Sequence, residues 1–131
     1  MHDHLIPLDG IKAVIVDDTG VVMDFFKLLL KHTGMETHFF QSPQAALEFL
    51  KKSSSEIDIV LLDIIMPKMD GYTLAREIRK FDTTIKLLAH TASPEIEIDQ
   101  NCKDAGINDY ILKPIYMHKL HEKITVLLEH K

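Results

Sequence analysis

The chain has 131 residues, a single cysteine and a formal net charge of −5, with 15 lysines and arginines against 20 aspartates and glutamates. This length suits one domain that buries roughly two-thirds of its unfolded surface without disulfides. The acidic balance argues against nucleic-acid binding and membrane contact by this domain, and no apolar run approaches the roughly 20 residues of a membrane span.

The amino terminus is expected to be a lead-in of residues 1–10, because Pro7 and Gly10 interrupt regular structure there. The folded domain is then expected to occupy residues 11–131. No basic segment followed by an apolar run precedes it, so we expect no signal peptide. The only cysteine, Cys102, has no partner in the chain, which favours a reducing compartment and predicts a cytoplasmic location.

Strand and helix patterns alternate five times along the chain. Apolar runs predict strands at residues 11–16, 37–40, 58–63, 85–90 and 109–112. Amphipathic patterns predict helices at residues 20–33, 43–50, 72–80, 94–104 and 116–129. Thr19 and Ser42 are the expected N-caps of the first two helices. Pro94 is expected to open a short, weakly held fourth helix whose thin apolar stripe is Ile96 and Ile98. This alternation predicts an α/β fold whose parallel sheet is covered on both faces.

Polar side chains stand where the predicted strands end. Asp17 and Asp18 follow the first strand, and Asp63 ends the third. Thr91 follows the fourth strand and Lys113 follows the fifth. Because the carboxyl ends of parallel strands share one edge of the sheet, where open α/β folds bind ligands, these groups should meet in one cluster.

Such a cluster points to phosphoryl chemistry. Three neighbouring carboxylates repel one another and require a cation, and a hard divalent ion such as Mg²⁺ fits oxygen ligands best. Zn²⁺ fits poorly, because His90 should point away from the cluster if side chains alternate along its strand. An aspartate beside the ion and Lys113 is a competent nucleophile toward phosphorus, and Thr91 can donate a hydrogen bond to a transferred oxygen. The sequence therefore predicts an aspartyl phosphate.

In combination, the motifs resemble the receiver domain of two-component response regulators. The resemblance covers residues 11–130. The matching motifs are Asp17-Asp18, Asp63 with Met66-Pro67 and Asp70-Gly71, Thr91-Ala92, Gly106, Asp109-Tyr110 and Lys113-Pro114. It implies a doubly wound, flavodoxin-like and CheY-like (βα)5 fold with five parallel strands in the order 2-1-3-4-5.

The resemblance also implies a role for each residue. Asp63 would be the phosphoacceptor and Lys113 the lysine that pairs with the phosphoryl group, on a peptide bond to Pro114 that is usually cis. The ligands of Mg²⁺ or Mn²⁺ would be Asp17, Asp18, Asp63 and the backbone carbonyl of Ile65. Thr91 and Tyr110 would be the switch residues, altering the face formed by the fourth helix, the fifth strand and the last helix.

The implied partners belong to a phosphorelay. A histidine kinase or a histidine phosphotransfer protein would supply the phosphoryl group from a phosphohistidine, and the downstream effector is unknown. The domain would signal rather than act on a separate substrate, catalysing only its own phosphorylation and dephosphorylation. The apolar Ile65 predicts slow self-dephosphorylation. Leu8-Asp9-Gly10 resembles the lead-in to receivers fused behind histidine kinases, which slightly favours a hybrid-kinase fragment over a stand-alone receiver.

Three alternatives remain. A phosphatase of the haloacid-dehalogenase type also uses a strand-end aspartate and Mg²⁺, but it needs Asp-x-Asp where this chain has adjacent Asp17 and Asp18. A flavodoxin-like FMN binder needs a hydroxyl-rich or glycine-rich phosphate loop where the same two carboxylates stand. An unphosphorylated docking module is disfavoured because all five polar groups of the cluster are present.

Overall fold

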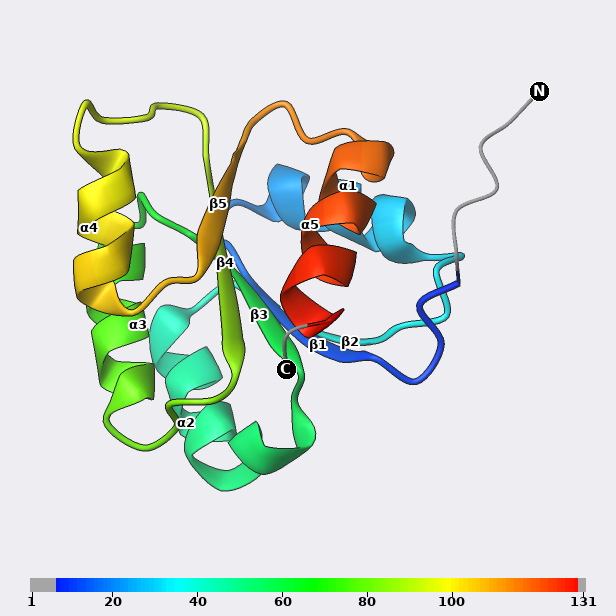
Figure 1. The fold of residues 1–131 in the computed structure, drawn as a ribbon, viewed down its shortest axis with the longest axis horizontal. Coiled ribbons are helices and arrows are strands. Elements are labelled where there is room, and N and C mark those ends of the chain that lie inside the picture. Colours follow the sequence, from blue (N-terminus) through cyan, green and yellow to red (C-terminus); the bar gives the residue numbers. More distant parts are fainter. Residues whose placement is uncertain (1–6, 130–131) are drawn as a thin grey trace.

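The computed structural model describes residues 7–129, and its elements follow the predicted alternation (Figure 1). The strands are β1 (Lys12–Val16), β2 (Glu36–Phe40), β3 (Ile59–Asp63), β4 (Lys86–Thr91) and β5 (Asp109–Leu112). The helices are α1 (Gly20–Leu30), α2 (Pro43–Ser53), α3 (Gly71–Arg79), α4 (Ile98–Ala105) and α5 (Met117–Glu129), with a short 3-10 helix, η1 (Ser54–Glu56), after α2.

The strands form one parallel sheet in the order β2-β1-β3-β4-β5, which confirms the predicted topology. The order reverses direction at β1 and β3, so their carboxyl ends flank the point where a doubly wound sheet opens a crevice. The loops that follow β4 and β5 rise at the same end of the molecule (Figure 1).

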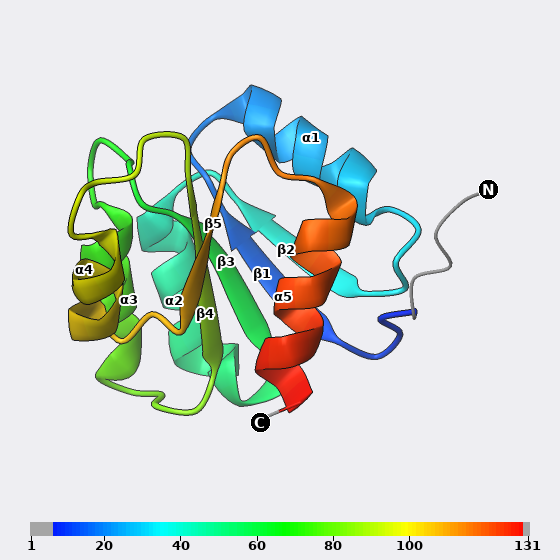
Figure 2. The same cartoon turned by 45° about the horizontal axis from the view of Figure 1, so that its top comes forward.

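Helices cover both faces of the sheet: α1 and α5 lie on one side, and α2, α3 and α4 on the other (Figure 2). Alternate residues of each strand serve the two layers. Leu61 of β3 packs in the layer of Phe26 from α1, whereas Val60 packs in the layer of Leu74 from α3. Burial of each such side chain contributes about 1.5 to 3 kcal/mol, which explains the continuous apolar runs of the strands.

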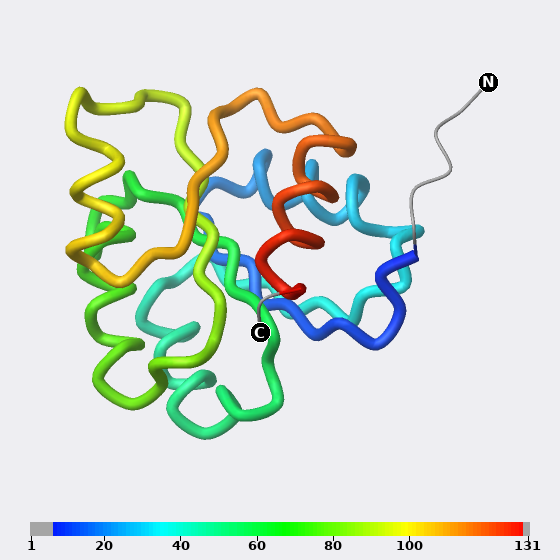
Figure 3. Tube along the Cα trace, viewed as in Figure 1, coloured from blue at the N-terminus to red at the C-terminus, as the bar shows by residue number. Residues whose placement is uncertain are grey.

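The fourth helix begins later than predicted. It starts at Ile98 rather than at Pro94, after a long loop that follows β4 (Figure 3). Pro94 and Ile96 are exposed in this loop. Ile98, Cys102 and Ala105 are its buried residues, so the apolar stripe assigned to Ile96 was wrong. The side chain of the N-cap residue, Glu97, makes no capping hydrogen bond. The helix is therefore short and thinly anchored, as the sequence indicated.

The two predicted N-caps behave differently. The Ser42 hydroxyl accepts the Ala45 backbone N–H at 3.1 Å, as a capping side chain does. Thr19 precedes α1, but its side chain makes no capping bond, and its backbone N–H donates to Asp17 Oδ1 at 2.9 Å. The start of α1 is thus tied to the carboxyl end of β1.

The boundary of the domain at residue 11 stays a prediction. Residues 1–6 of the predicted lead-in lie outside the described residues. Leu8 is buried with the α1 and α5 layer, and its backbone N–H donates to the Thr33 carbonyl oxygen at 2.8 Å.

Candidate functional site

Three polar residues form a row across the carboxyl end of the sheet. Asp63 stands opposite His90 in the pairing of β3 with β4. Val16 stands opposite Leu62, which brings the next residue, Asp17, beside Asp63. Neighbours in a parallel register point to the same face, here the face covered by α1 and α5. All three side chains are buried, and one ligand atom from each lies within 4.8 Å of the other two.

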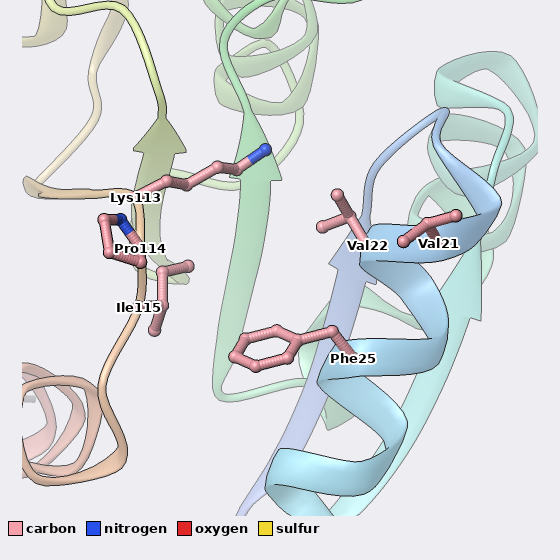
Figure 4. Close-up of a pocket in the computed structure, with 6 residues that line it drawn as sticks. All are labelled: Val21, Val22, Phe25, Lys113, Pro114 and Ile115. Atoms are coloured by element: carbon pink, nitrogen blue, oxygen red, sulfur yellow. The ribbon is translucent and has the colours of Figure 1, made fainter.

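A lysine reaches this row from the far edge of the sheet. Lys113 Nζ lies 3.3 Å from Asp17 Oδ2 and 3.9 Å from Asp63 Oδ2. Its side chain extends from the segment after β5 toward the end of β3 (Figure 4). The peptide bond from Lys113 to Pro114 is cis, as the family resemblance implies. One ammonium group is therefore shared by two carboxylates.

Asp17 is stabilised in its charged form. Its complete burial would raise the pKa of this carboxyl group. The hydrogen bond with His90 Nε2, at 3.0 Å, and the Thr19 backbone N–H act against burial, as does the positive charge of Lys113. Together they lower the pKa of Asp17 to about 2. Asp17 is thus a fixed anion at every physiological pH.

Asp63 has the opposite electrostatic balance. Burial raises its pKa, and the neighbouring negative charge of Asp17 raises it further. His90, Lys113 and the Ile65 backbone N–H, which donates to Asp63 Oδ1 at 3.2 Å, offset only part of this effect. The negative charge of Asp63 is therefore not fully compensated. A further cation would stabilise this carboxylate, and so would a bond from one of its oxygen atoms to an electrophile.

The structure corrects the prediction for His90. This histidine was expected to point away from the cluster, but its Nε2 atom bonds to Asp17. Because Thr91 was expected in the cluster, alternation of side chains along β4 predicted that its neighbour His90 would point the other way. The register instead aligns His90 with Asp63 and leaves Thr91 on the opposite face. A polar residue in the otherwise apolar run Leu87-Leu88-Ala89 was the available sequence signal.

Two predicted residues lie on the α4 side of the sheet. Thr91 is buried, and its hydroxyl accepts the Ser93 backbone N–H at 3.2 Å. Tyr110 stands opposite Ala89 in the pairing of β4 with β5 and packs in the layer of α2, α3 and α4. A hydrogen bond with Asp99 of α4 is the main cause that raises the pKa of Tyr110. Both switch roles stay predictions.

The remaining predicted metal ligands lie at the mouth of the site. Asp18 is partly buried beside Asp17 and is not among the three residues with closely spaced ligand atoms. Ile65 lies two residues after Asp63 in the sequence, and it is 59% exposed. The structure thus brings Asp17, Asp63 and Lys113 together, and the ligand roles of Asp18 and of the Ile65 carbonyl stay predictions.

The donor set fits a divalent cation. Asp17 and Asp63 present buried carboxylate oxygens. Burial and the charge of Asp17 raise the pKa of Asp63, so a nearby cation would stabilise its charged form. Within residues 7–129, this is the one group of three or more potential ligands at such spacing. A metal at this edge would therefore meet protein oxygen atoms, the Nε2 atom of His90 and the ammonium group of Lys113.

Comparison with known proteins agrees with this geometry. The family model of the response regulator receiver domain matches residues 13–125. The chain belongs to this family, and it is a receiver domain of two-component signalling. Its class is thus a signalling domain rather than an enzyme that processes a separate substrate. Receiver domains as a family bind Mg²⁺ at an acidic cluster, and this chain groups Asp17 and Asp63 at the corresponding edge of the sheet.

Individual relatives are longer proteins, and this chain matches only a part of each. A hybrid signal transduction histidine kinase L from Dictyostelium discoideum is 34% identical over 86% of this chain and 7% of that protein. A heme response regulator HssR from Staphylococcus epidermidis is 30% identical over 90% of this chain and 51% of that protein. The chain thus spans about half, or much less, of the length of these relatives.

A solved structure supports the same fold. The CheY-like response regulator receiver domain protein from Methanospirillum hungatei is 29% identical, with a TM-score of 0.80 over 92% of this chain and 94% of that chain. Among the residues that the structure describes, no helix has the length and apolar character needed to cross a membrane.

Proposed function

We propose that Asp63 accepts a phosphoryl group from a phosphohistidine. A carboxylate oxygen of Asp63 attacks phosphorus, the P–N bond breaks, and the departing imidazole takes a proton from solvent. Lys113, 3.9 Å from Asp63 Oδ2, would neutralise charge on the transferred oxygens. The observation that carries this proposal is the position of the Lys113 ammonium between the carboxylates of Asp17 and Asp63.

The reaction is proposed to depend on a divalent cation, Mg²⁺ or Mn²⁺. When bound, such an ion supplies positive charge that offsets the repulsion among the carboxylates and the phosphoryl oxygens. The proposed ligands are Asp17, Asp18, Asp63 and the backbone carbonyl of Ile65. The pKa of Asp63, raised by burial and by the negative charge of Asp17, supports this requirement, because a nearby cation would stabilise the charged carboxylate.

The phosphodonor is proposed to be a histidine kinase or a histidine phosphotransfer protein that docks on α1. An apolar groove of about 280 Å³ lies between α1 and the segment after β5 (Figure 4). Val21 is 79% exposed and Phe25 is 42% exposed at this groove. Because Lys113 lines the groove and also contacts Asp17, a partner covering the groove would place its phosphohistidine beside the site.

We infer that the signal leaves through the α4 side of the sheet. The phosphoryl group adds negative charge at the end of β3, which would attract the Thr91 hydroxyl and change the packing of Tyr110. The hydrogen bond of Tyr110 with α4 and the thin anchoring of that helix support this route to an unidentified effector. A cytoplasmic location is proposed from the lone, buried Cys102.

Phosphorylation by a small donor tests the proposal. The purified chain is incubated with acetyl phosphate and Mg²⁺, and its intact mass is measured. We expect the wild type and Asp24→Asn, which changes an exposed aspartate of α1, to gain one phosphoryl group, and Asp63→Asn to gain none. EDTA should prevent the gain. Equal gain by wild type and Asp63→Asn, or no gain by either, would contradict the proposal.

Slow self-dephosphorylation is proposed as a property of this site. The Ile65 side chain is exposed near Asp63 and has no polar atom to orient an attacking water molecule. Decay of the phosphorylated chain, followed by intact mass, should therefore be faster in Ile65→Asn than in wild type. A wild-type lifetime of only seconds would contradict this expectation.

A further inference from the structure

His90 brings a nitrogen ligand to a site whose other donors are oxygen atoms. Its side chain is 1% exposed, and its Nε2 atom lies 3.0 Å from Asp17 Oδ2. A ring nitrogen of His90 also belongs to the group of ligand atoms, with Asp17 and Asp63, that lie within 4.8 Å of one another. This spacing is short enough for one ion to contact all three residues. The imidazole therefore changes which cations the site can hold.

The choice of cation follows from ligand chemistry. Mg²⁺ prefers oxygen ligands, whereas imidazole nitrogen favours first-row transition metals, with affinity that generally rises from Mn²⁺ toward Cu²⁺. We propose that His90 Nε2 is a metal ligand and that the site binds transition-metal cations of the Mn²⁺ and Co²⁺ type in preference to Mg²⁺. This inference rests on the proposed function, because it concerns the same cation site.

The packing of the ring gives the second argument. The centroid of the His90 ring lies 5.0 Å from that of Phe26, and its Nδ1 atom has no hydrogen-bond partner in the described part of the chain. A buried polar atom without a partner costs about 1 to 3 kcal/mol, so an apolar side chain would pack here at lower cost. The contact of Nε2 with the acidic site is what distinguishes histidine from such a side chain.

Metal binding requires two local changes. The imidazole must carry its proton on Nδ1, which leaves the Nε2 lone pair free for the ion and breaks the hydrogen bond with Asp17. The Lys113 ammonium, which contacts the same Asp17 oxygen, must move aside. Its side chain is 21% exposed and flexible, and it already lies 3.9 Å from Asp63, so it can turn toward that carboxylate or toward solvent.

Pulsed electron paramagnetic resonance tests the ligand directly. The full chain is freed of metals and loaded with Mn²⁺, and magnetic coupling to ¹⁴N is recorded. We expect coupling from a bound imidazole in wild type and in His118→Leu, which removes an exposed histidine of α5, and no coupling in His90→Leu. In parallel titrations, the preference for Mn²⁺ over Mg²⁺ should fall about tenfold or more in His90→Leu.

The outcomes separate this inference from the proposed function. Wild type that binds Mn²⁺ without ¹⁴N coupling overturns the role of His90, whether or not the variant folds. Coupling that persists in His90→Leu, or in His90→Gln if the leucine variant is unfolded, overturns it as well. Phosphorylation of Asp63 is measured with Mg²⁺ in the same preparations. A phosphorylated wild type without nitrogen coupling rejects only the nitrogen ligand, whereas nitrogen coupling without phosphorylation rejects only the phosphoacceptor.

Discussion

His90 and Thr91 are consecutive residues of β4, yet they belong to two regions of different construction. On the His90 side, Asp17 receives hydrogen bonds from His90 and the Thr19 backbone and contacts the charged group of Lys113. On the Thr91 side, the strand leads into an exposed loop and then into α4. Charged hydrogen bonds fix the first region, whereas a few apolar side chains hold the second.

The difference teaches how one sheet edge can serve two purposes. A site that stabilises developing charge needs groups held in place before the reaction, because reorientation would cost energy at that moment. A surface that changes shape needs a low cost of rearrangement, and elements with few buried contacts provide it. Alternation of side chains along β4 separates the two demands onto opposite faces.

The largest expected effect comes from loosening α4. Ile98→Ala removes one of its three buried side chains and should weaken its attachment by about 3 kcal/mol. Cys102 reports the opening, because it is buried and its pKa is raised to about 11, chiefly by burial, so it reacts only when exposed. Labelling of Cys102 by iodoacetamide should therefore become roughly a hundredfold faster, since each 1.4 kcal/mol is a factor of ten.

A matched control is available two residues earlier. Ile96→Ala makes the same chemical change at a fully exposed position and should leave the labelling rate unchanged. Native-state amide exchange in α1 should be the same in both variants. If Ile98→Ala accelerated amide exchange in α1 as much as it accelerated labelling of Cys102, α4 would open only when the whole domain unfolds. The contrast between the two regions would then be lost.

A smaller effect is expected from Asp17→Asn on the fixed side. Asp17 has a pKa of about 2 in the folded state against 3.8 for an unperturbed aspartate, which corresponds to about 2 kcal/mol. Because the folded pKa is lowered, this stability is present above pH 4 and is lost as the pH falls from about 4 to about 2. Urea unfolding in EDTA should show the variant less stable at pH 7, with the difference closing in acid.

Asp63→Asn should act with the opposite sign. The pKa of Asp63 is raised, chiefly by burial, so its charged form destabilises the folded state once the pH exceeds the folded pKa. In EDTA at pH 7 the variant should be more stable than wild type, and the gain should vanish when acid protonates Asp63. A loss of stability at pH 7 would show that the Ile65 and Lys113 contacts outweigh burial and repulsion.

The sequence predicted the sheet and the residues at its edge because both follow from local patterns. Each apolar run that stops at a polar residue identifies a strand end, and parallel strand ends converge. The register between neighbouring strands is not a local property, since it depends on how β3 and β4 pack together. That is why the sequence predicted the convergence of Asp17, Asp63 and Lys113, whereas its prediction for the direction of the His90 side chain was wrong.

The start of α4 illustrates a second limit. Pro94 is compatible with a first helical turn, and Ile96 and Ile98 suggested one apolar stripe. In the structure only Ile98 reaches the core, and Ile96 is fully exposed. With two isoleucines and no capping side chain at Glu97, tertiary packing rather than sequence decides where the helix begins.

The smallest expected effect comes from the bond that ties the loop before α4 to α3. The Tyr72 hydroxyl of α3 donates to Glu95, and the pair is exposed, so Tyr72→Phe should change the free energy of unfolding by less than about 1 kcal/mol. Amide exchange in residues 92–97 should nevertheless be faster, with Tyr116→Phe as an exposed tyrosine control. Glu95 also accepts a hydrogen bond from the Asn101 side chain of α4 at 3.4 Å, so unchanged loop exchange would mean that this bond and backbone contacts, not the Tyr72 hydroxyl, hold the loop.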